Sequence, residues 1–330
     1  MGKPTLQSLA AELSVSRQTI SNVINAPERV HPDTRRRVQE AIRAQGYRPS
    51  VAARALRIQR SMSIALRLRP ASDGINGAVM DGFLHALVER AAEQGYRIVL
   101  FTATDTADEL TQLSQLRGSN AMDACVLTDT FSGDPRPDRL RAAGIAFSAF
   151  GRPWDAAGDH SWVDVDGRAG TASAVDHLRR RGHDRIGFLG WPDASGVGAD
   201  RKSGWQDALG LTDAEADHLF VPATDTVANG AAGMRTLLDR GVTAVVCASD
   251  SLALGALTES RQTRGTAVVG YDDTPVARAV GLSSVRQPVE DAADTALALV
   301  LAQLADPAAP REHILLAPTL VPRTLEAFLS

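Results

Sequence analysis

Apolar residues near the N-terminus recur in two short runs with a helical period. In the first run they stand at i, i+3, i+4 and i+7, which places them on one face of a helix. They are Leu6, Leu9, Ala10 and Leu13. In the second run Ile20, Val23 and Ile24 form the inward stripe. Ser16 stands where its hydroxyl can accept a free backbone N–H of the first turn. The pattern predicts a helix-turn-helix over residues 5–25.

The second of these helices leaves hydrogen-bonding side chains on its outer face. Such a helix fits the DNA major groove, where each base pair presents a distinguishable pattern of donors and acceptors. Arg17 suits a bidentate contact with guanine and Gln18 one with adenine, each pair contributing about 1–3 kcal/mol of discrimination. The residues of this motif that we predict to contact DNA are Thr5, Leu6, Ser16, Arg17, Gln18, Thr19, Ser21, Asn22 and Asn25.

A third helix should complete a small N-terminal domain over residues 1–49. Pro32 and Asp33 can open it, Val38 faces the core, and Gly46 is placed to end it. Residues 35–37 are three arginines at its start. They form either a solvated charged face or a set of phosphate contacts.

The segment 50–60 has the composition of a short helix, because Pro49 stops the preceding one and Ser50 can cap a new one. Isolated helices shorter than about 12 residues are marginal in water, so this one should order only when docked. Its arginines and an exposed Leu56 would fit a minor groove, with the leucine wedged between base steps. We predict DNA contacts at Ala53 and Leu56; a plain flexible linker is the alternative.

From Ser61 onward, short β-rich runs alternate with helical periods. The predicted strands contain SIALRL, YRIVLFT, ACVLT, IAFSAF, RIGFLG, TAVVCAS and TAVVGY. Such alternation predicts α/β architecture, with doubly wound parallel sheets covered by helices on both faces. About 270 residues are too many for one such unit and suit two. Ligands bind beyond the carboxyl ends of strands in open α/β sheets, so the boundary between the two units is the predicted ligand site.

Charge is distributed unevenly along the chain. The formal net charge is −4, yet residues 1–60 hold 11 Lys and Arg against four Asp and Glu, a balance of +7. Residues 61–330 hold 24 basic and 35 acidic residues, a balance of −11. A small basic domain joined to an acidic body is typical of a polyanion-binding module linked to a separate domain.

Other classes of protein and site are disfavoured. No apolar run approaches the roughly 18 residues of a membrane span, and the N-terminus lacks a signal core, so we expect a cytoplasmic, nucleoid-associated protein. Cys125 and Cys247 stand in apolar segments without His or Cys at metal-ligand spacing, and we expect buried free thiols. We expect no metal and no cofactor.

Several motifs in this order resemble the lactose-repressor/galactose-repressor family of transcription regulators. They are TLQSLAAELSVSRQTISNVIN, GYRPSVAARAL, VDVDG, HLRRRGHDRIGFLG, ADRKSGW, ASDSLALGAL and VVGYDDTPVA. The resemblance implies a homodimer that reads a near-palindromic operator and a periplasmic-binding-protein-like core, residues 61–330, that binds a small effector. It also implies three crossings between two subdomains, expected near residues 160, 288 and 318. One subdomain then spans about 61–160 and 288–318, the other about 161–287 and 319–330.

The resemblance also indicates an effector site. Sugars have hydroxyl rims and apolar ring faces, so their sites combine charged or amide groups with an aromatic platform. Where several relatives have an acid, this chain has FGRP, and Arg152 is expected to take over hydroxyl contacts. On the predicted DNA-reading helix, Asn22 stands where relatives often have arginine, which suggests a changed preference for the operator base at that position. The predicted effector-binding residues are Arg152, Trp154, Trp162, Trp191, Arg201, Ser249, Asp272 and Gln287.

The resulting hypothesis is a dimeric repressor that a sugar releases from its operator. The combination FGRPW, SWVDVDG and GWPDASGVGADRKSGW resembles disaccharide-responsive regulators of actinobacteria, which implies cellobiose or another glucoside. A regulator that binds DNA only together with its effector is the first alternative. A sugar receptor without a DNA role is the second, and the basic N-terminal domain argues against it. An enzyme is disfavoured, because GVGAD lacks the third glycine of a dinucleotide fingerprint and no catalytic triad order is present.

Overall fold

The structure is a computed structural model, and it divides into two compact units, Met1–Ser61 and Met62–Ser330. The described residues are 5–45, 47, 60–68, 75, 77–155, 158–192, 195–261 and 266–323. Among the helices in these ranges, none has the length and hydrophobicity needed to cross a bilayer. The expected helix of segment 50–60, and with it the predictions for Ala53 and Leu56, lies outside the described residues.

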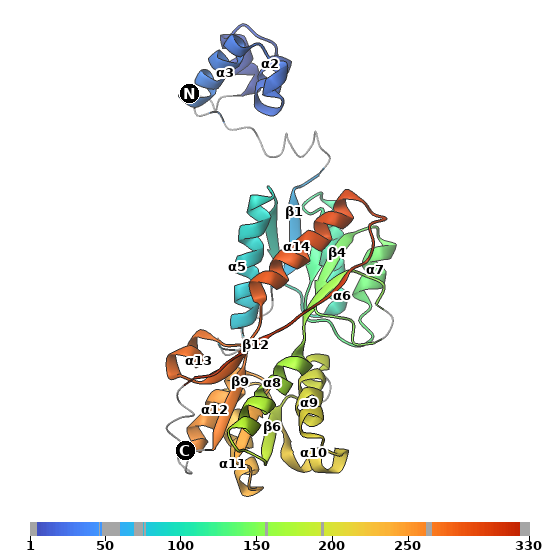
Figure 1. The fold of residues 1–330 in the computed structure, drawn as a ribbon. Helices are drawn as coiled ribbons and strands as arrows, with labels where there is room; N and C mark the ends of the chain where they lie inside the picture. The colour runs from blue at the N-terminus through green and yellow to red at the C-terminus, as the bar shows by residue number, and fades with distance from the viewer. Residues whose placement is uncertain are drawn as a thin grey trace. The chain divides into compact units, whose positions relative to one another are not determined.

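The N-terminal unit is a small bundle of short helices (Figure 1). Its elements are α1 (Leu6–Glu12), α2 (Arg17–Asn25), the 3-10 helix η1 (Pro27–Arg29) and α3 (Pro32–Ala44). Apolar side chains from the three α-helices meet in one core, in which the most buried residues are Leu9, Ala10, Ile20, Val23, Val38 and Tyr47. The predicted helix-turn-helix and third helix are confirmed.

The second unit contains two six-stranded sheets. The first has the order β11-β5-β4-β3-β1-β2, and all of its strands are parallel. Its strands are β1 (Ser63–Arg67), β2 (Arg97–Phe101), β3 (Ala124–Leu127), β4 (Ala146–Phe150), β5 (Trp162–Val165) and β11 (His313–Leu316). The second has the order β12-β10-β9-β8-β6-β7, in which only β12 is antiparallel. Its strands are β6 (Ile186–Gly190), β7 (Phe220–Pro222), β8 (Ala244–Cys247), β9 (Ala267–Tyr271), β10 (Ser283–Arg286) and β12 (Thr319–Val321).

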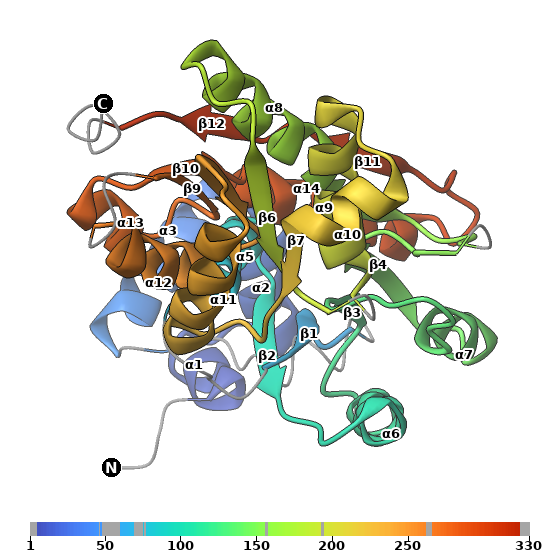
Figure 2. The ribbon, with the colours of Figure 1, turned by 90° about the horizontal axis from the view of Figure 1, so that it is seen from below.

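Helices cover both faces of each sheet, as the alternating pattern predicts. On the first sheet, α5 (Ala78–Glu93) and α14 (Val289–Ala305) share one core, while α6 (Thr106–Gly118) and α7 (Arg136–Ala142) share another. On the second sheet α8 packs against α9 and α11 against α12, and Figure 2 shows these two pairs on opposite sides of β6. The helices of this subdomain are α8 (Gly167–Arg180), α9 (Gly196–Leu209), α10 (Asp213–Leu219), α11 (Val227–Asp239), α12 (Asp250–Ser260) and α13 (Pro275–Val280).

The chain passes between the sheets three times. It leaves β5 for α8 after Val165, leaves β10 for α14 at residues 287–288, and leaves β11 for β12 at residues 317–318. The first crossing therefore lies later than the predicted position near residue 160, because β5 pairs with β4 and β11 and belongs to the first sheet. All three crossings start at the carboxyl end of a parallel strand, which is where α/β sheets bind ligands.

Cys125 and Cys247 are buried free thiols, as expected from their apolar segments. Cys125 lies on β3, and Cys247 is the last residue of β8. Burial raises the pKa of both thiols above the ordinary value. Both therefore remain protonated and unreactive, and they act as small apolar core residues.

Candidate functional sites

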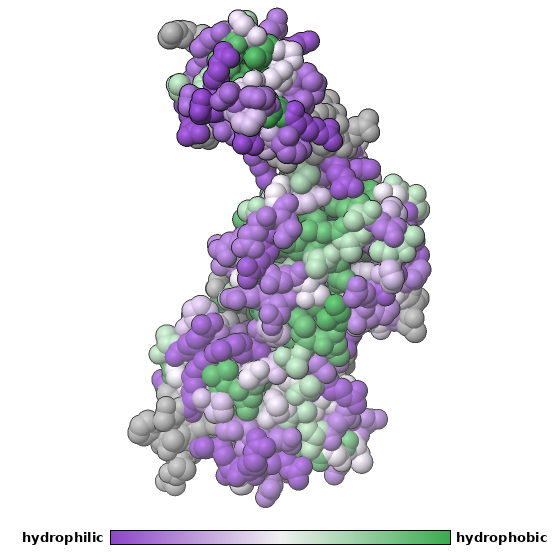
Figure 3. All heavy atoms as spheres, turned by 45° about the horizontal axis from the view of Figure 1, so that its top comes forward, coloured by the Kyte–Doolittle hydropathy of each residue, from purple (hydrophilic) through white to green (hydrophobic). Residues whose placement is uncertain are grey.

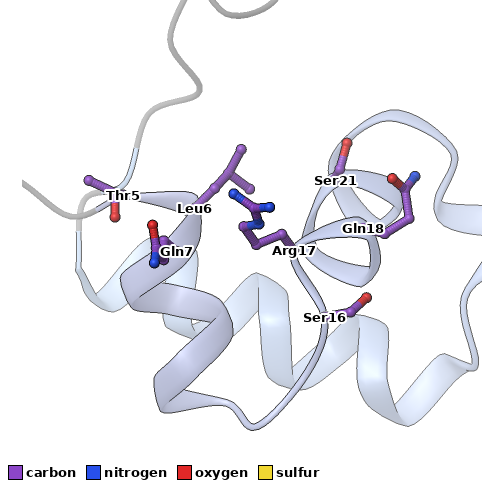
Figure 4. A pocket seen from close by; sticks show the side chains of 7 residues that line it. All are labelled: Thr5, Leu6, Gln7, Ser16, Arg17, Gln18 and Ser21. Carbon is purple, nitrogen blue, oxygen red and sulfur yellow. The ribbon is translucent and has the colours of Figure 1, made fainter.

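The starts of α1 and α2 border a groove on the surface of the N-terminal unit. Figure 4 shows Arg17 reaching from α2 toward Leu6 of α1, with Thr5 and Gln7 beside it. Most of the groove consists of side chains that the sequence predicts to contact DNA. The residues that line it are Thr5, Leu6, Gln7, Ser16, Arg17, Gln18 and Ser21.

Local hydrogen bonds order the outer face of α2. The Ser16 hydroxyl accepts a hydrogen bond from the backbone N–H of Thr19 at 2.9 Å, which confirms Ser16 as the N-cap. The Gln18 amide donates to the Asn22 side-chain oxygen at 2.9 Å, one turn further along. Arg17 and Gln18 are exposed, and Asn22 is partly exposed. The face therefore presents one guanidinium and two linked amides to the solvent.

Two other predicted DNA contacts stand at helix ends. Thr5 begins α1 with a capping box, in which its hydroxyl accepts from the N–H of Ser8 and the Ser8 hydroxyl accepts from the N–H of Thr5. Thr5 therefore has a structural role in addition to its predicted one. Asn25 is the last residue of α2, and its side chain lies outside the described residues.

Two of the arginines at the start of α3 have partners within the unit. Arg36 lies 3.3 Å from the exposed carboxylate of Asp33. Arg37 donates to the backbone carbonyl of Leu13 at 3.3 Å, at the corner between α1 and α2. Arg37 therefore braces the helix-turn-helix, whereas the Arg36 pair is exposed and contributes little to stability.

In the second unit, Arg201 of α9 is the centre of a polar group beside the carboxyl ends of β8 and β9. Its guanidinium lies 3.6 Å from the ring centre of Tyr271 and 5.2 Å from that of Trp191. Its Nη1 donates to the carbonyl of Ala248 at 2.5 Å and lies 3.7 Å from Asp272 Oδ1. The arginine is almost fully buried, so its position is fixed by stacking, a hydrogen bond and an ion pair together.

Asp272 links this group to the second crossing. The Gln287 amide donates to Asp272 Oδ1 at 2.7 Å, and Gln287 directly precedes Pro288, the N-cap of α14. Asp272 has a φ of 108°, which is unusual for a residue with a Cβ and marks a constrained turn after β9. Burial raises the pKa of its carboxyl to about 7, although the nearby Arg201 lowers it. Arg201, Asp272 and Gln287, which the sequence selected separately, therefore form one cluster.

Several polar atoms at and near this cluster are buried without a partner. Within the described part of the chain no hydrogen bond reaches the following four groups: Arg201 Nε, Tyr271 Oη, and the indole N–H groups of Trp154 and Trp191. An unpaired buried polar group costs about 1–3 kcal/mol. Three of the four are donors only, so a molecule rich in hydroxyl oxygens would satisfy them, and the rings beside them offer apolar faces.

On the first subdomain, Arg152 follows β4 and contacts two carboxylates. Its Nε donates to Asp164 Oδ2 at 2.8 Å, and its Nη2 donates to Asp200 Oδ2 at 2.7 Å. The guanidinium also lies 4.7 Å from the ring of Trp154. Burial raises the pKa of Asp164, an effect that Arg152 opposes. The guanidinium of Arg152 thus bonds to two protein carboxylates. Its contact with sugar hydroxyls stays a prediction.

Two of the predicted effector residues have mainly structural contacts. Ser249 caps α12, because its hydroxyl accepts from the N–H of Leu252 at 3.2 Å and also bonds to Asp225. Trp162 packs against the first-sheet core and stacks on His313 at 5.1 Å. The structure therefore groups Trp191 with Arg201, and Trp154 with Arg152, but it places Trp162 on a sheet face.

Sequence reasoning missed three residues of these clusters. Tyr271 stands directly before Asp272, and Asp200 directly before Arg201, so both were next to selected residues. Asp164 lies two residues from Trp162 on the same strand. Apart from this adjacency, the sequence does not indicate that these residues belong to the clusters, because each contacts residues from distant parts of the chain.

Comparison with known proteins agrees with this architecture. Residues 5–50 match the family described as bacterial regulatory proteins, lacI family, and residues 175–324 match a periplasmic binding protein-like domain. The chain is 34% identical over 303 residues to the HTH-type transcriptional regulator CelR of Thermobifida fusca. That alignment covers 87% of this chain and 88% of CelR.

Solved structures show the same fold over nearly the whole chain. A structure described as a transcriptional regulator CelR-cellobiose complex has a TM-score of 0.70 and 30% identity, and the match covers 97% of this chain and 99% of that one. A lac repressor dimer bound to operator and the anti-inducer ONPF has a TM-score of 0.81 at 22% identity, with 98% and 99% covered. The second likeness concerns the fold alone.

Proposed function

The chain belongs to the lacI family of bacterial regulatory proteins, and we propose that it is a homodimeric repressor that a disaccharide or glucoside releases from its operator. In this proposal the N-terminal unit reads a near-palindromic operator, and the sugar binds between the two sheets of Met62–Ser330. The protein is a transcriptional regulator, and we propose that it has no catalytic role.

The outer face of α2 supports the DNA-reading part of the proposal. Arg17 is exposed at the start of the helix, and the side chains of Gln18 and Asn22 are joined by a hydrogen bond. Guanidinium and amide groups are the side chains best matched to purine edges in the major groove. We propose that these residues, with Thr5, Leu6, Ser16, Thr19, Ser21 and Asn25, contact the operator.

The observation that carries the sugar-binding part is the cluster around Arg201. It combines a buried guanidinium, the Asp272 carboxyl and the Gln287 amide with unpaired N–H groups beside aromatic rings. Polar groups that converge beside aromatic faces are typical of small-ligand sites. The CelR structure with bound cellobiose, 30% identical to this chain, favours a disaccharide. Trp154 and Arg152 would meet the sugar from the first subdomain.

Exposed apolar side chains on the first subdomain support a dimer. Val88 of α5 and Leu100 of β2 are each 44% exposed, and β2 is an edge strand of its sheet. On the face drawn in Figure 3, hydrophobic atoms (green) also gather between hydrophilic flanks (purple) in the second unit. Apolar surface at an edge strand is commonly covered by a partner, and a second copy matches a near-palindromic operator.

A thermal-shift screen of the purified chain against mono- and disaccharides, with a second panel of purines, tests the sugar site. A ligand that binds only the native state at 100 times its Kd adds about 2.7 kcal/mol of stability. We expect cellobiose or a related glucoside to raise Tm, and we expect Arg201→Ala to lose the shift, because it leaves Asp272 without its ion-pair partner. If purines but no sugars raise Tm, the proposed effector class is wrong.

A further inference from the structure

Arg152 joins the two subdomains of the second unit. It follows β4 of the first sheet, and one of its carboxylate partners, Asp164, lies on β5 of the same sheet. Its other partner, Asp200, lies on α9 of the second subdomain, 2.7 Å from Nη2. Asp200 Oδ2 also accepts from the backbone N–H of Arg168 at 3.0 Å, at the start of α8. The Asp200 carboxylate thus binds both the backbone just after the first crossing and the guanidinium of Arg152 from the first subdomain.

An aromatic contact lies beside this ion pair. Trp154 comes from the first subdomain, and its indole ring lies against Gly196, the first residue of α9. A Cβ built on Gly196 would stand 2.2 Å from the indole ring, so only glycine allows this approach. Arg152 in turn covers the Trp154 ring at 4.7 Å. The ion pair and the aromatic contact therefore connect the same two elements.

We propose that Arg152, Asp200, Trp154 and Gly196 form a clasp that holds the two subdomains together, and that Asp200 is a positioning residue for the effector response. In the clasp, Asp200 fixes Arg152 and through it the Trp154 ring, without contacting the effector itself. The clasp favours the arrangement of the two subdomains in which both contact the ligand. The subdomains are therefore partly preorganised before the effector binds. The effector part of this proposal rests on the proposed function, whereas the clasp itself does not.

The charges in the clasp determine what each substitution does. One guanidinium lies between two carboxylates, so Arg152→Gln leaves Asp164 and Asp200 facing each other as like charges across the subdomain boundary. The side chains of Arg152 and Asp200 are only 20% and 14% exposed, so solvent screens this interaction less than it screens a surface pair. Asp200→Asn removes only the attraction between subdomains. Asp164→Asn removes a contact within one subdomain and is the matched control.

The direct test measures the distance between the subdomains in the full-length chain. Spin labels go on Ala142→Cys in α7 and Ala214→Cys in α10, both exposed sites, while the native thiols are buried. Labelled chain is diluted with unlabelled chain, so that most of the labelled dimers carry only one labelled protomer. Without sugar, we expect Arg152→Gln and Asp200→Asn to lengthen or broaden the distance distribution. We expect Asp164→Asn to leave it unchanged, and Asp200→Glu to restore part of the loss.

Cellobiose affinity gives the second measurement. We expect Arg152→Gln and Asp200→Asn each to weaken binding about tenfold, and the double variant to be little worse than either, because the two side chains act as one unit. Unchanged distances in both single variants would overturn the clasp. A tenfold loss confined to Arg152→Gln, with unchanged sugar affinity in Asp200→Asn, would overturn the positioning role of Asp200, since the loss would then come from the sugar contact of Arg152 alone. If the wild type binds no sugar, the effector assignment fails, while the distances still decide the clasp.

Discussion

Asp272 combines burial, an unusual backbone conformation and a charged partner in one residue. Burial raises the pKa of its carboxyl to about 7, and the charge of Asp250 adds to this, whereas Arg201 opposes it. In the unfolded chain the carboxyl titrates near its ordinary value of 3.8. Between these two values the native state binds the proton more tightly, so its stability falls as the pH rises from about 4 to about 7.

The variant Asp272→Asn should remove this pH dependence. Over the range from pH 5 to pH 7, the wild type should lose Tm relative to the variant by about 2 °C or more, given that 1 kcal/mol corresponds to about 2–4 °C in a domain of this size. Calorimetric melting of both proteins at each pH checks this. Asp250, whose carboxyl has a pKa raised to about 6 chiefly by burial, titrates in both proteins and interacts with Asp272, so some pH dependence remains in the variant. Parallel curves would show that Asp272 does not titrate in this range.

At the scale of single elements, α2 holds the side chains proposed to read bases, and this helix is capped by Ser16 and packed through Ile20 and Val23. The cap and the apolar stripe fix the rotation of the helix in its unit. Which side chains face outward follows from that rotation, and the hydrogen bond from Gln18 to Asn22 then orders two of them.

Replacing Gln18 by Ala should relax specificity at one base pair of each half-site. The expected loss is about 1–3 kcal/mol on the preferred sequence, with little change on random DNA. Selection from a randomised DNA library, followed by competition binding, measures both effects. As a control, Arg36→Ala removes an exposed charge from the start of α3, and if Arg36 contacts phosphate it should weaken all sequences about equally. A uniform loss with Gln18→Ala would mean that this residue contacts only the DNA backbone.

The elements of both units could be predicted from the sequence because periodicity and capping are local properties. The first crossing is predicted near residue 160 but follows Val165, because its position depends on β5 pairing with β11, which lies about 150 residues further along the chain. The role of Trp162 was also not evident, since its stacking partner His313 is on that same distant strand. Arg152 was selected as a sugar contact, but its partner on the other subdomain, Asp200, is visible only once α9 is in place.

At the scale of the whole molecule, the proposed function requires two ligands, sugar and operator, that oppose each other. A sugar that favours one arrangement of the two subdomains weakens operator binding only if the operator-bound dimer favours another. Such coupling is reciprocal, so operator must weaken sugar binding by the same factor as sugar weakens operator binding. A typical coupling free energy of about 1–3 kcal/mol corresponds to a 5–150-fold change.

The most direct test of this coupling is to titrate the sugar into the dimer with and without saturating operator. The operator sequence comes from the selection out of a randomised DNA library. For a repressor that sugar releases, we expect the Kd of the sugar to be at least about fivefold higher for the operator complex than for the free dimer. Saturating sugar should lower operator affinity by the same factor. Equal sugar affinities in the two titrations would contradict a sugar-released repressor. A lower Kd on the operator complex would contradict it as well, because the sugar would then act as a co-repressor.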